Sequence, residues 1–359
     1  MNQTEENMNA NIKIVGVGGG GSNAVESMYN EGIKGVSYLI INTDKMAIEA
    51  SAVTDRVAIG TLGAGNNPEV ARQAAMDHAD EIRKALDDKQ TQMVFITAGM
   101  GGGTGTGAAP VVAAIARELN LLTVGIVTIP FRFEGMNKIK KALNGIQQME
   151  PNVDAIIVIN NEKLTETPDF PLPLAFKYAD SVLLNAAKSI ADIVNIRGYM
   201  NIDFADVCTT LRGGKMAVIN TGTGEGEHRV GKAIENALES SLLNNRDIYK
   251  CNRLLLNFYC SKDTAITAQE VSQIEAFTSK MQTEMDVIWG LTYDDTLDGK
   301  CSVTLLSAGQ GVICPEEYIG QYEQIAKVRK DKRLNGTLAR LDEDDELLQR
   351  MTERPAVSR

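Results

Sequence analysis

Two glycine-rich stretches have the composition of phosphate-binding loops. The first reads GVGGGGSNA from Gly16 to Ala24, and the second reads TAGMGGGTGTGAAP from Thr97 to Pro110. Each follows a short apolar run and precedes a segment with helical spacing, which predicts a loop between a strand and a helix. The N-terminus of a helix presents unpaired N–H groups, and glycines let the backbone approach a phosphate without Cβ clashes. Both stretches therefore predict anion binding through backbone amides.

The first stretch alone leaves three interpretations open. It contains GxGxxG from Gly16 to Gly21, the fingerprint of a dinucleotide-binding Rossmann fold, and Asp44 would then be the acid that binds the ribose. A glycine turn that only packs a strand against a helix is the plainer alternative. Two such loops on different strands instead favour one nucleoside triphosphate held between them. Because the lysine of GxxxxGK[ST] is missing, amides, threonine hydroxyls and a metal would hold that triphosphate.

Six motifs then resemble the tubulin/FtsZ superfamily and, within it, the FtsZ family of bacterial cell division. In chain order they read GVGGGGSNAV, INTD, GAGNNPEV, GGGTGTG, PFRFEG and NIDFADV, and the resemblance covers about residues 12–312. It implies a cytoplasmic GTPase that binds GTP or GDP, with Mg²⁺ held mainly through the phosphates and no dedicated metal ligands. It also implies head-to-tail assembly of identical subunits into filaments at the mid-cell division site.

The resemblance assigns a nucleotide-binding role to three loops and two helices. The loops would hold the phosphates, Phe176 would stack on the base, Asp180 would bond the guanine edge, and Glu134 would contact the ribose. Without the resemblance, Phe176 is better explained as a core aromatic and Asp180 as a surface carboxylate. Lys138 stands where the family usually has arginine, so its contact should be weaker or absent. The full set is Gly19, Gly20, Gly21, Ser22, Asn23, Asp44, Ala64, Gly65, Asn66, Gly101, Gly102, Gly103, Thr104, Gly105, Thr106, Gly107, Glu134, Lys138, Phe176 and Asp180.

The motif NIDFADV supplies the candidate catalytic residues Asn201, Asp203 and Asp206. Taken alone, it is better explained as an ordinary acidic loop. The resemblance implies that this loop completes the catalytic site of the next subunit, where its carboxylates would orient or deprotonate the attacking water. A free monomer would then bind GTP but hydrolyse it slowly.

The elements that must position these residues alternate between strands and helices in the first half of the chain. Apolar runs predict strands over Ile12–Val17, Val36–Asn42 and Met93–Thr97, and helical spacing predicts helices over Pro68–Leu86 and Met136–Met149. In the second half, Asp286–Tyr293 is predicted to be a strand. The alternation in the first half predicts a parallel sheet covered on both faces, with ligands outside the carboxyl ends of the strands. The predicted fold is α/β, a Rossmann-like parallel-sheet GTPase domain joined by a long central helix to a smaller α+β domain. The expected segments are a flexible N-terminus (1–11), a GTP-binding domain (12–171), a central helix (172–200), a C-terminal domain (201–312, with a catalytic loop at 201–207) and a tail (313–359).

Composition excludes several other classes of protein. The net charge of −11 over 359 residues argues against nucleic-acid binding, which depends on Lys and Arg. No apolar run approaches the length of a membrane span. The two histidines, His78 in a predicted polar helix and His228 in a loop, do not favour a zinc site or a histidine triad. The five scattered cysteines are expected to be reduced thiols in the cytoplasm.

Besides Lys138, three departures from the family pattern leave open whether this chain is a principal FtsZ or a paralogue. Only Thr61 and Leu62 lie between VAIG (Val57–Gly60) and GAGNNP, where the family carries a longer stretch. The segment TGTGEGEHR (Thr221–Arg229) matches the family pattern only loosely and is expected to be a surface turn. The tail lacks the usual peptide, although ELLQRMTERPA could bind division-ring tethering and regulatory proteins, and no direct membrane insertion is expected. The alternatives are a divergent FtsZ paralogue that regulates or co-assembles with a principal FtsZ, and an NAD(P) oxidoreductase that rests on GxGxxG alone.

Overall fold

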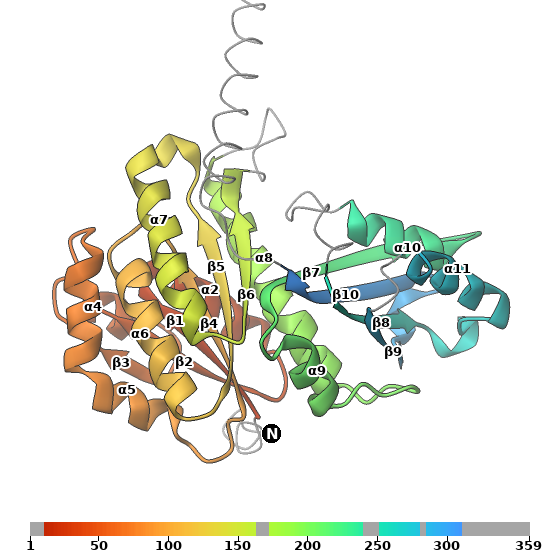
Figure 1. Cartoon of the computed structure of the whole chain (residues 1–359), viewed down its shortest axis with the longest axis horizontal. Helices are drawn as coiled ribbons and strands as arrows, with labels where there is room; N and C mark the ends of the chain where they lie inside the picture. The colour runs from red at the N-terminus through yellow and green to blue at the C-terminus, as the bar shows by residue number, and fades with distance from the viewer. Residues whose placement is uncertain (1–10, 163–171, 240–250, 281–284, 311–359) are drawn as a thin grey trace, which may run out of the picture. The chain divides into compact units, whose positions relative to one another are not determined.

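The computed structural model describes residues 11–162, 172–239, 251–280 and 285–310 (Figure 1). All the described residues belong to one compact unit. The expected N-terminal segment, except residue 11, and the expected tail with its candidate peptide lie outside the described residues.

Six parallel strands form the first part of the sheet, in the order β3-β2-β1-β4-β5-β6. β1, β5 and β6 are buried along their whole length, as expected for a parallel sheet covered on both faces. The sequence predicted β1 and β2 with these bounds, placed the end of β4 two residues early, and missed β3. The strands are β1 (Ile12–Val17), β2 (Val36–Asn42), β3 (Arg56–Ala58), β4 (Met93–Gly99), β5 (Leu122–Ile129) and β6 (Ala155–Asn160).

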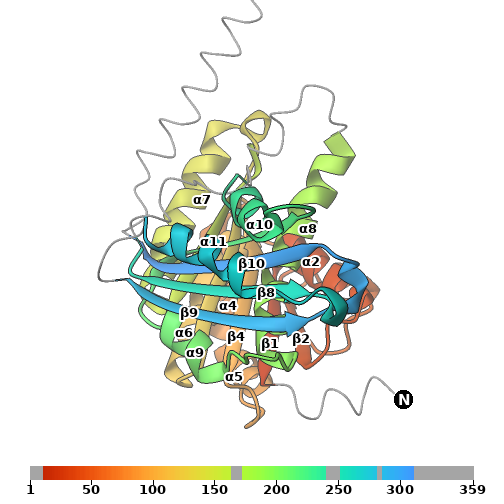
Figure 2. The ribbon, with the colours of Figure 1, turned by 90° about the vertical axis from the view of Figure 1, so that its right-hand side faces the viewer.

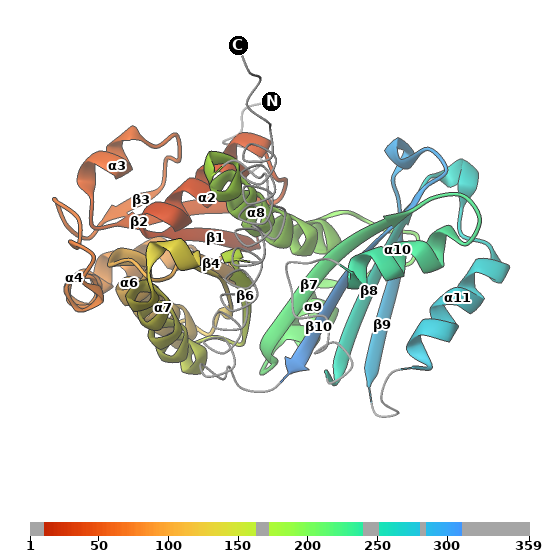
Figure 3. The same cartoon turned by 90° about the horizontal axis from the view of Figure 1, so that it is seen from above.

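Helices cover both faces of these strands, as the view in Figure 3 shows. α2 (Gly18–Glu31), α3 (Lys45–Ala50) and α8 (Leu172–Asn195) lie on one face. α4 (Pro68–Asp77), α5 (Ala79–Leu86), α6 (Thr104–Glu118) and α7 (Met136–Met149) lie on the other. In the described part of the chain, none of the helices is long and apolar enough to cross a membrane.

One predicted helix, over Pro68–Leu86, is in fact two. His78 separates α4 from α5 with backbone angles φ −107° and ψ 20°. Its N–H lies 3.2 Å and its ring Nδ1 2.8 Å from the carbonyl oxygen of Ala74. The backbone N–H and the ring of His78 thus both contact the carbonyl oxygen of Ala74, and these contacts end α4. Helical periodicity in the sequence does not reveal them.

The second part of the sheet is mixed and continues the first. β7 (Lys215–Gly224) pairs in parallel with β6 at only two positions, after which the order is β7-β10-β8-β9. α10 (Arg229–Leu238) and α11 (Ala268–Thr278) cover one face of these strands, as Figure 2 shows. The remaining elements are α9 (Phe204–Leu211), β8 (Arg253–Cys260), β9 (Asp286–Tyr293) and β10 (Cys301–Gln310). The mixed domain that the sequence predicted is therefore joined to the parallel strands by a short backbone ladder.

The segment expected to be a surface turn, Thr221–Arg229, is mostly not one. Its first four residues belong to β7, and Gly222 and Gly224 are buried beneath α10. A Cβ at Gly222 would overlap the carbonyl oxygen of Ala233, and one at Gly224 that of Arg229. These glycines therefore let the helix lie directly on the strand, and only the residues between β7 and α10 form a turn.

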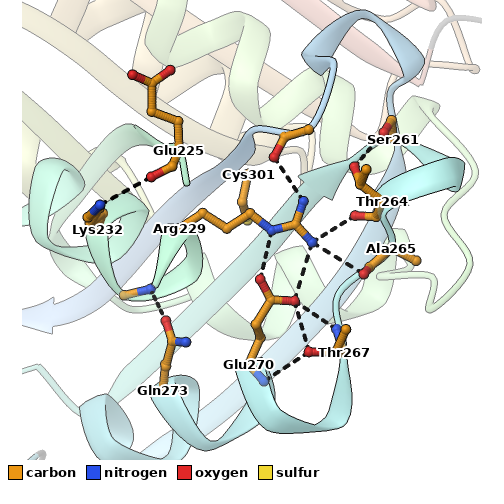
Figure 4. Close-up of polar contacts among 12 residues, drawn as sticks. Glu225, Arg229, Lys232, Ser261, Thr264, Ala265, Thr267, Glu270, Gln273 and Cys301 are labelled. Atoms are coloured by element: carbon orange, nitrogen blue, oxygen red, sulfur yellow. Dashed lines mark hydrogen bonds and ion pairs between the residues drawn. The ribbon is translucent and has the colours of Figure 1, made fainter. Parts of the chain in front are cut away.

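An ion pair connects the first turns of α10 and α11 (Figure 4). Arg229 Nε lies 2.7 Å from Glu270 Oε1, and both side chains are largely buried. The guanidinium also donates to the carbonyl oxygens of Gly299, Thr264 and Ala265. Burial alone would raise the pKa of Glu270, but hydrogen bonds from Arg229 and Thr267 lower it. The arginine is saturated by internal partners, so this cluster is structural.

Candidate nucleotide-binding and catalytic site

The two predicted glycine loops lie side by side at the carboxyl edge of the parallel strands. β1 pairs with β4 in register up to Val17 and Ala98, so α2 and α6 begin next to each other. Neither helix has a side-chain cap or an acidic residue in its first turn. Their first N–H groups and the positive ends of both helix dipoles are therefore available to an anion at this edge.

The first glycine stretch, predicted to be a loop, forms the first turns of α2, because the helix begins at Gly18 directly after β1. Its residues divide into solvent-facing and packed ones. Gly19, Gly20 and Asn23 are exposed, and a Cβ at Gly19 would meet nothing within 4 Å. Gly21 is buried, and a Cβ there would overlap the carbonyl oxygen of Thr97 in β4. The Ser22 hydroxyl is also buried and has no hydrogen-bond partner. The side-chain positions of Gly21 and Ser22 thus face inward, and binding of the phosphates by Gly19–Asn23 stays a prediction.

The second loop divides in the same way. Gly102 and Thr104 are partly exposed, a Cβ at Gly102 would meet nothing within 4 Å, and the Thr104 hydroxyl lies 2.7 Å from that of Thr43. By contrast, the hydroxyl of Thr106 is turned inward and accepts the N–H of Gly101 at 2.8 Å.

Three glycines of the second loop serve packing as well. A Cβ at Gly101 would come within 2.9 Å of the Lys138 carbonyl oxygen. At Gly105 it would overlap the carbonyl oxygen of Gly99, and at Gly107 that of Pro68. Gly105, Thr106 and Gly107 are all buried, so their side-chain positions face the protein rather than a ligand.

A third predicted loop, Gly63–Pro68, completes the convergence at this edge. A Cβ at Gly103 would lie 2.8 Å from Ala64 Cβ and 3.0 Å from Asn67 N, so the two loops touch. Ala64 is buried in that contact, whereas Gly65 and Asn66 are exposed. Lys141 Nζ, a cation that the sequence analysis did not single out, donates to the carbonyl oxygen of Asn66 at 2.9 Å.

Asp44 has a structural role that the sequence did not predict. Its Oδ1 accepts the N–H groups of Met46 and Ala47 at 3.0 and 3.2 Å, which caps α3. Its neighbour Thr43, also in the INTD motif, supplies the hydroxyl that meets Thr104. Because Asp44 Oδ1 is engaged with α3, the first candidate from this motif for contact with a ligand is Thr43.

The residues expected around the ribose and base gather about Phe131. The Phe176 ring, in α8, meets Phe131 edge-on with centroids 5.1 Å apart, and Phe131 stacks on Phe133 at the same distance. Glu134 Oε1 accepts the N–H of Phe131, while its Oε2 lies 3.1 Å from Lys138 Nζ. Lys138 is therefore paired with Glu134. Phe133, exposed and part of PFRFEG, is a further candidate that sequence reasoning missed.

Asp180 lies one helical turn beyond Phe176, on the same side of α8. Burial raises the pKa of its carboxyl to about 6. Proton uptake therefore begins near neutral pH, and the acid is mostly neutral below 6. Only the ionised form can accept two hydrogen bonds from a guanine edge.

This pKa predicts that guanine-nucleotide affinity falls in mild acid. If Asp180 must be ionised, Kd should rise little between pH 8 and 7 and by about tenfold at pH 5. Titration calorimetry with GDP across that range would measure the effect. Asp180→Asn should bind GDP more weakly with a flatter profile. A wild-type Kd that stays constant from pH 7 to 5 would contradict the role.

The candidate catalytic residues lie at the other edge of the parallel strands. The segment predicted as a loop is partly helical, because α9 begins at Phe204. Asp203 caps it, accepting the Asp206 N–H at 2.8 Å while Asp206 Oδ2 accepts the Asp203 N–H at 3.0 Å. Asn201 Oδ1 accepts the N–H of Gly198 at 3.1 Å.

Helix α8 separates the two groups of residues. It follows β6 at the carboxyl edge and ends at Asn195, whose amide donates to the carbonyl oxygen of Lys34 just before β2. Its 24 residues correspond to roughly 36 Å. One chain therefore does not bring Asp203 and Asp206 to its own glycine loops.

Known proteins share both parts of this chain. The GTPase-domain model of the Tubulin/FtsZ family matches residues 11–169, and the model of the FtsZ family C-terminal domain matches residues 215–311. The cell division protein FtsZ of Porphyromonas gingivalis is 49% identical over 336 residues, which cover 92% of this chain and 74% of that protein. The chain belongs to the tubulin/FtsZ family. The FtsZ of Aquifex aeolicus is 45% identical over 287 residues, which cover 78% of this chain and 77% of that protein.

Solved structures agree with this membership. An FtsZ dimer from M. jannaschii has a TM-score of 0.76 at 38% identity, covering 86% of this chain and 90% of that chain. CetZ2 from Haloferax volcanii, at 19% identity, has a TM-score of 0.74 over 89% of this chain and 99% of its own. The second likeness shows the tubulin/FtsZ fold alone.

Family membership decides how the glycine loops are understood. As a tubulin/FtsZ protein with a matching GTPase domain, the chain is a GTPase and binds GTP or GDP. The NAD(P) oxidoreductase interpretation, based on GxGxxG alone, loses its support. Among the described residues, no three His, Cys, Asp or Glu side chains gather as a metal site.

Proposed function

We propose that this chain assembles head to tail into filaments at the mid-cell division site in the bacterial cytoplasm, and that it hydrolyses GTP where two subunits meet. The observation that carries the proposal is the separation of two incomplete half-sites. Uncapped helix N-termini lie at one edge of the parallel strands, and the Asp203–Asp206 pair lies at the other. Stacking identical subunits in one direction would bring the second half-site of one to the first of the next.

On the nucleotide side, the exposed residues would bind different parts of GTP. The phosphates would lie over Gly19, Gly20, Gly102 and Thr104, which are exposed or partly exposed. Phe176 and Asp180 would bind the base, and Glu134 would approach the ribose. The packed residues of the same loops, such as Gly21 and Gly107, would act by letting the helices come close.

Mg²⁺ would accompany the triphosphate and be bound mainly through its oxygens. When bound, it supplies positive charge against the charge that develops during phosphoryl transfer. The hydroxyls of Thr43 and Thr104, 2.7 Å apart, are oxygen donors of the kind that this ion accepts. Their pairing at the loop edge supports the fit.

On the catalytic side, Asp203 and Asp206 of the neighbouring subunit would orient the attacking water or take its proton. Exposed apolar side chains at both edges support a contact between copies. Leu62 is 95% exposed beside the glycine loops, and Tyr199 is 73% exposed beside Asn201. The intact aspartate pair supports an active GTPase over a paralogue that only binds GTP. Division-ring tethering and regulatory proteins would bind the tail.

The proposal is tested by sedimentation with phosphate release measured in the same tube. With GTP and Mg²⁺ the chain should pellet and release phosphate, whereas with GDP it should stay in the supernatant. Because the site is shared, the hydrolysis rate per subunit should rise with protein concentration. GTP binding without pelleting would favour the regulatory paralogue, and a rate per subunit that is flat across the assembly threshold would contradict the shared site.

A further inference from the structure

The segment that leads into the candidate catalytic residues is attached to the edge strand of the sheet. Tyr199 N and Met200 N donate to the carbonyl oxygen of Leu291 in β9 at 2.7 and 3.2 Å, and Leu291 N donates to the carbonyl oxygen of Met200 at 3.0 Å. β9 is otherwise paired only with β8 among the described strands. The antiparallel contact ends one residue before Asn201, so β9 sets where the catalytic segment begins.

A glycine next to this contact makes room for the middle of the catalytic segment. A Cβ at Gly290 would lie 2.7 Å from Ile202 Cγ1 and 2.8 Å from Ile202 Cδ1, and it would also lie 2.9 Å from the buried Asn257 Oδ1 in β8. Real Cβ atoms do not approach that closely, and Ile202 is only 3% exposed, so it has little freedom to turn away. Ile202 stands between Asn201 and Asp203 in sequence. Any side chain at Gly290 would therefore push on the backbone that carries both.

A second glycine, Gly198, precedes Tyr199 in the segment that pairs with β9. A Cβ at Gly198 would lie 2.7 Å from the carbonyl oxygen of Leu291, the acceptor of the contact, and 3.0 Å from that of Met200. The Gly198 N–H also donates to Asn201 Oδ1. Each of the two paired segments thus carries a glycine beside the contact, and each glycine permits an approach that alanine would obstruct.

We infer that Gly290 is a positioning residue for GTP hydrolysis, because Ile202 packs against it and so holds Asp203 and Asp206 in place for the nucleotide of the neighbouring subunit. The inference rests on the proposed catalytic role of those aspartates. Gly290 itself would touch neither the nucleotide nor the water. Its effect should therefore appear in turnover rather than in nucleotide binding.

The test is Gly290→Ala in the full chain, with Gly231→Ala as the matched control. Gly231 lies within α10, where an added Cβ meets only the Gln273 side chain, at 3.1 Å. We expect Gly290→Ala to bind GTP within about twofold of wild type and to lose about 10–100-fold in turnover, the cost of a small misplacement of catalytic groups. Gly231→Ala should keep wild-type turnover.

Two further measurements separate positioning from a general loss of structure. Adding Ile202→Ala to Gly290→Ala removes the two nearest obstructing atoms and leaves Asn257 Oδ1 in close contact, so it should restore part of the turnover. Mixing Gly290→Ala with Gly102→Asp, which places a negative charge in the phosphate loop, should also restore turnover. Mixing it with Asp206→Asn should not, because both variants damage the same half-site.

Three results would overturn the inference. Turnover of Gly290→Ala within about twofold of wild type would do so, as would recovery in neither the double variant nor the mixture with Gly102→Asp. Loss of GTP binding in both Gly290→Ala and Gly198→Ala would show that these glycines serve the fold as a whole. If Asp206→Asn keeps wild-type turnover, the proposed catalytic role of the aspartates is wrong. If Asp206→Asn loses turnover but Gly290→Ala keeps it, only the inference about Gly290 is wrong.

Discussion

Asparagine in place of Asp206 is expected to leave GTP binding within about twofold of wild type and to lower turnover by about 10²–10⁴-fold, the usual contribution of a positioned acid or base. Asparagine is preferred to alanine as the test because Asp206 also accepts the N–H of Asp203. The amide oxygen keeps that hydrogen bond and with it the start of α9, so the variant removes the charge alone. Equilibrium binding of labelled GTP and phosphate release at fixed protein concentration measure the two effects.

Mixing experiments provide the control for a site shared between subunits. Gly102→Asp and Asp206→Asn should each be inactive alone, because each damages one half of every interface. In a random co-assembly, about one interface in four would combine the two intact halves, so activity should reappear. Wild-type turnover in Asp206→Asn would contradict the catalytic role. A mixture that stays inactive although both variants pellet together would contradict the division of the site between two subunits.

Gly107→Ala is expected to destabilise the fold by about 3 kcal/mol, near the upper end of overpacking costs. Replacing a helical glycine with alanine by itself stabilises a helix by about 1 kcal/mol. Here the added Cβ would overlap the carbonyl oxygen of Pro68, which is backbone at the start of α4 and cannot rotate away. The two helices would have to separate. Urea unfolding followed by circular dichroism gives the change in the free energy of unfolding.

Gly102→Ala is the matched control in the same loop. Its Cβ meets no atom within 4 Å, so the free energy of unfolding should change by less than about 0.5 kcal/mol. That open space is where the phosphates are proposed to lie, so GTP binding should weaken instead. Equal stability losses in the two variants would show that the division between packed and open glycines is wrong.

This division explains how far the sequence could predict the site. The density of glycine located both candidate phosphate-binding stretches, but the first is not a loop, because α2 begins at Gly18 directly after β1, and only residues 100–103 lie between β4 and α6. The apolar run before the first stretch predicted the bounds of β1. Which glycine faces a ligand and which faces a neighbouring backbone depends on partners distant in the sequence. Gly107 meets Pro68, and Gly21 meets Thr97. Composition has no signal for such pairs.

The elements show the same limit. Met136–Met149 and Asp286–Tyr293 have the predicted bounds. Gly135 and Glu150 flank the helix, and Asp294 follows the strand. The break at His78 depends on a side-chain contact with Ala74, and the length of β7 depends on α10 covering Gly222 and Gly224. β6 and β7 pair at only two positions, and the sequence of neither strand shows a pattern from which this pairing could be predicted.

The placement of the two half-sites at opposite ends of α8 gives any filament of this chain a polarity. At one tip, the last subunit would hold GTP with no aspartates from a neighbour above it. At the other tip, the aspartates would be exposed with no nucleotide beneath them. The first tip would keep its GTP intact and open to exchange, while every interior nucleotide would be sealed and subject to hydrolysis. The two ends of one polymer would therefore differ in nucleotide state, and growth and loss of subunits would not be symmetrical.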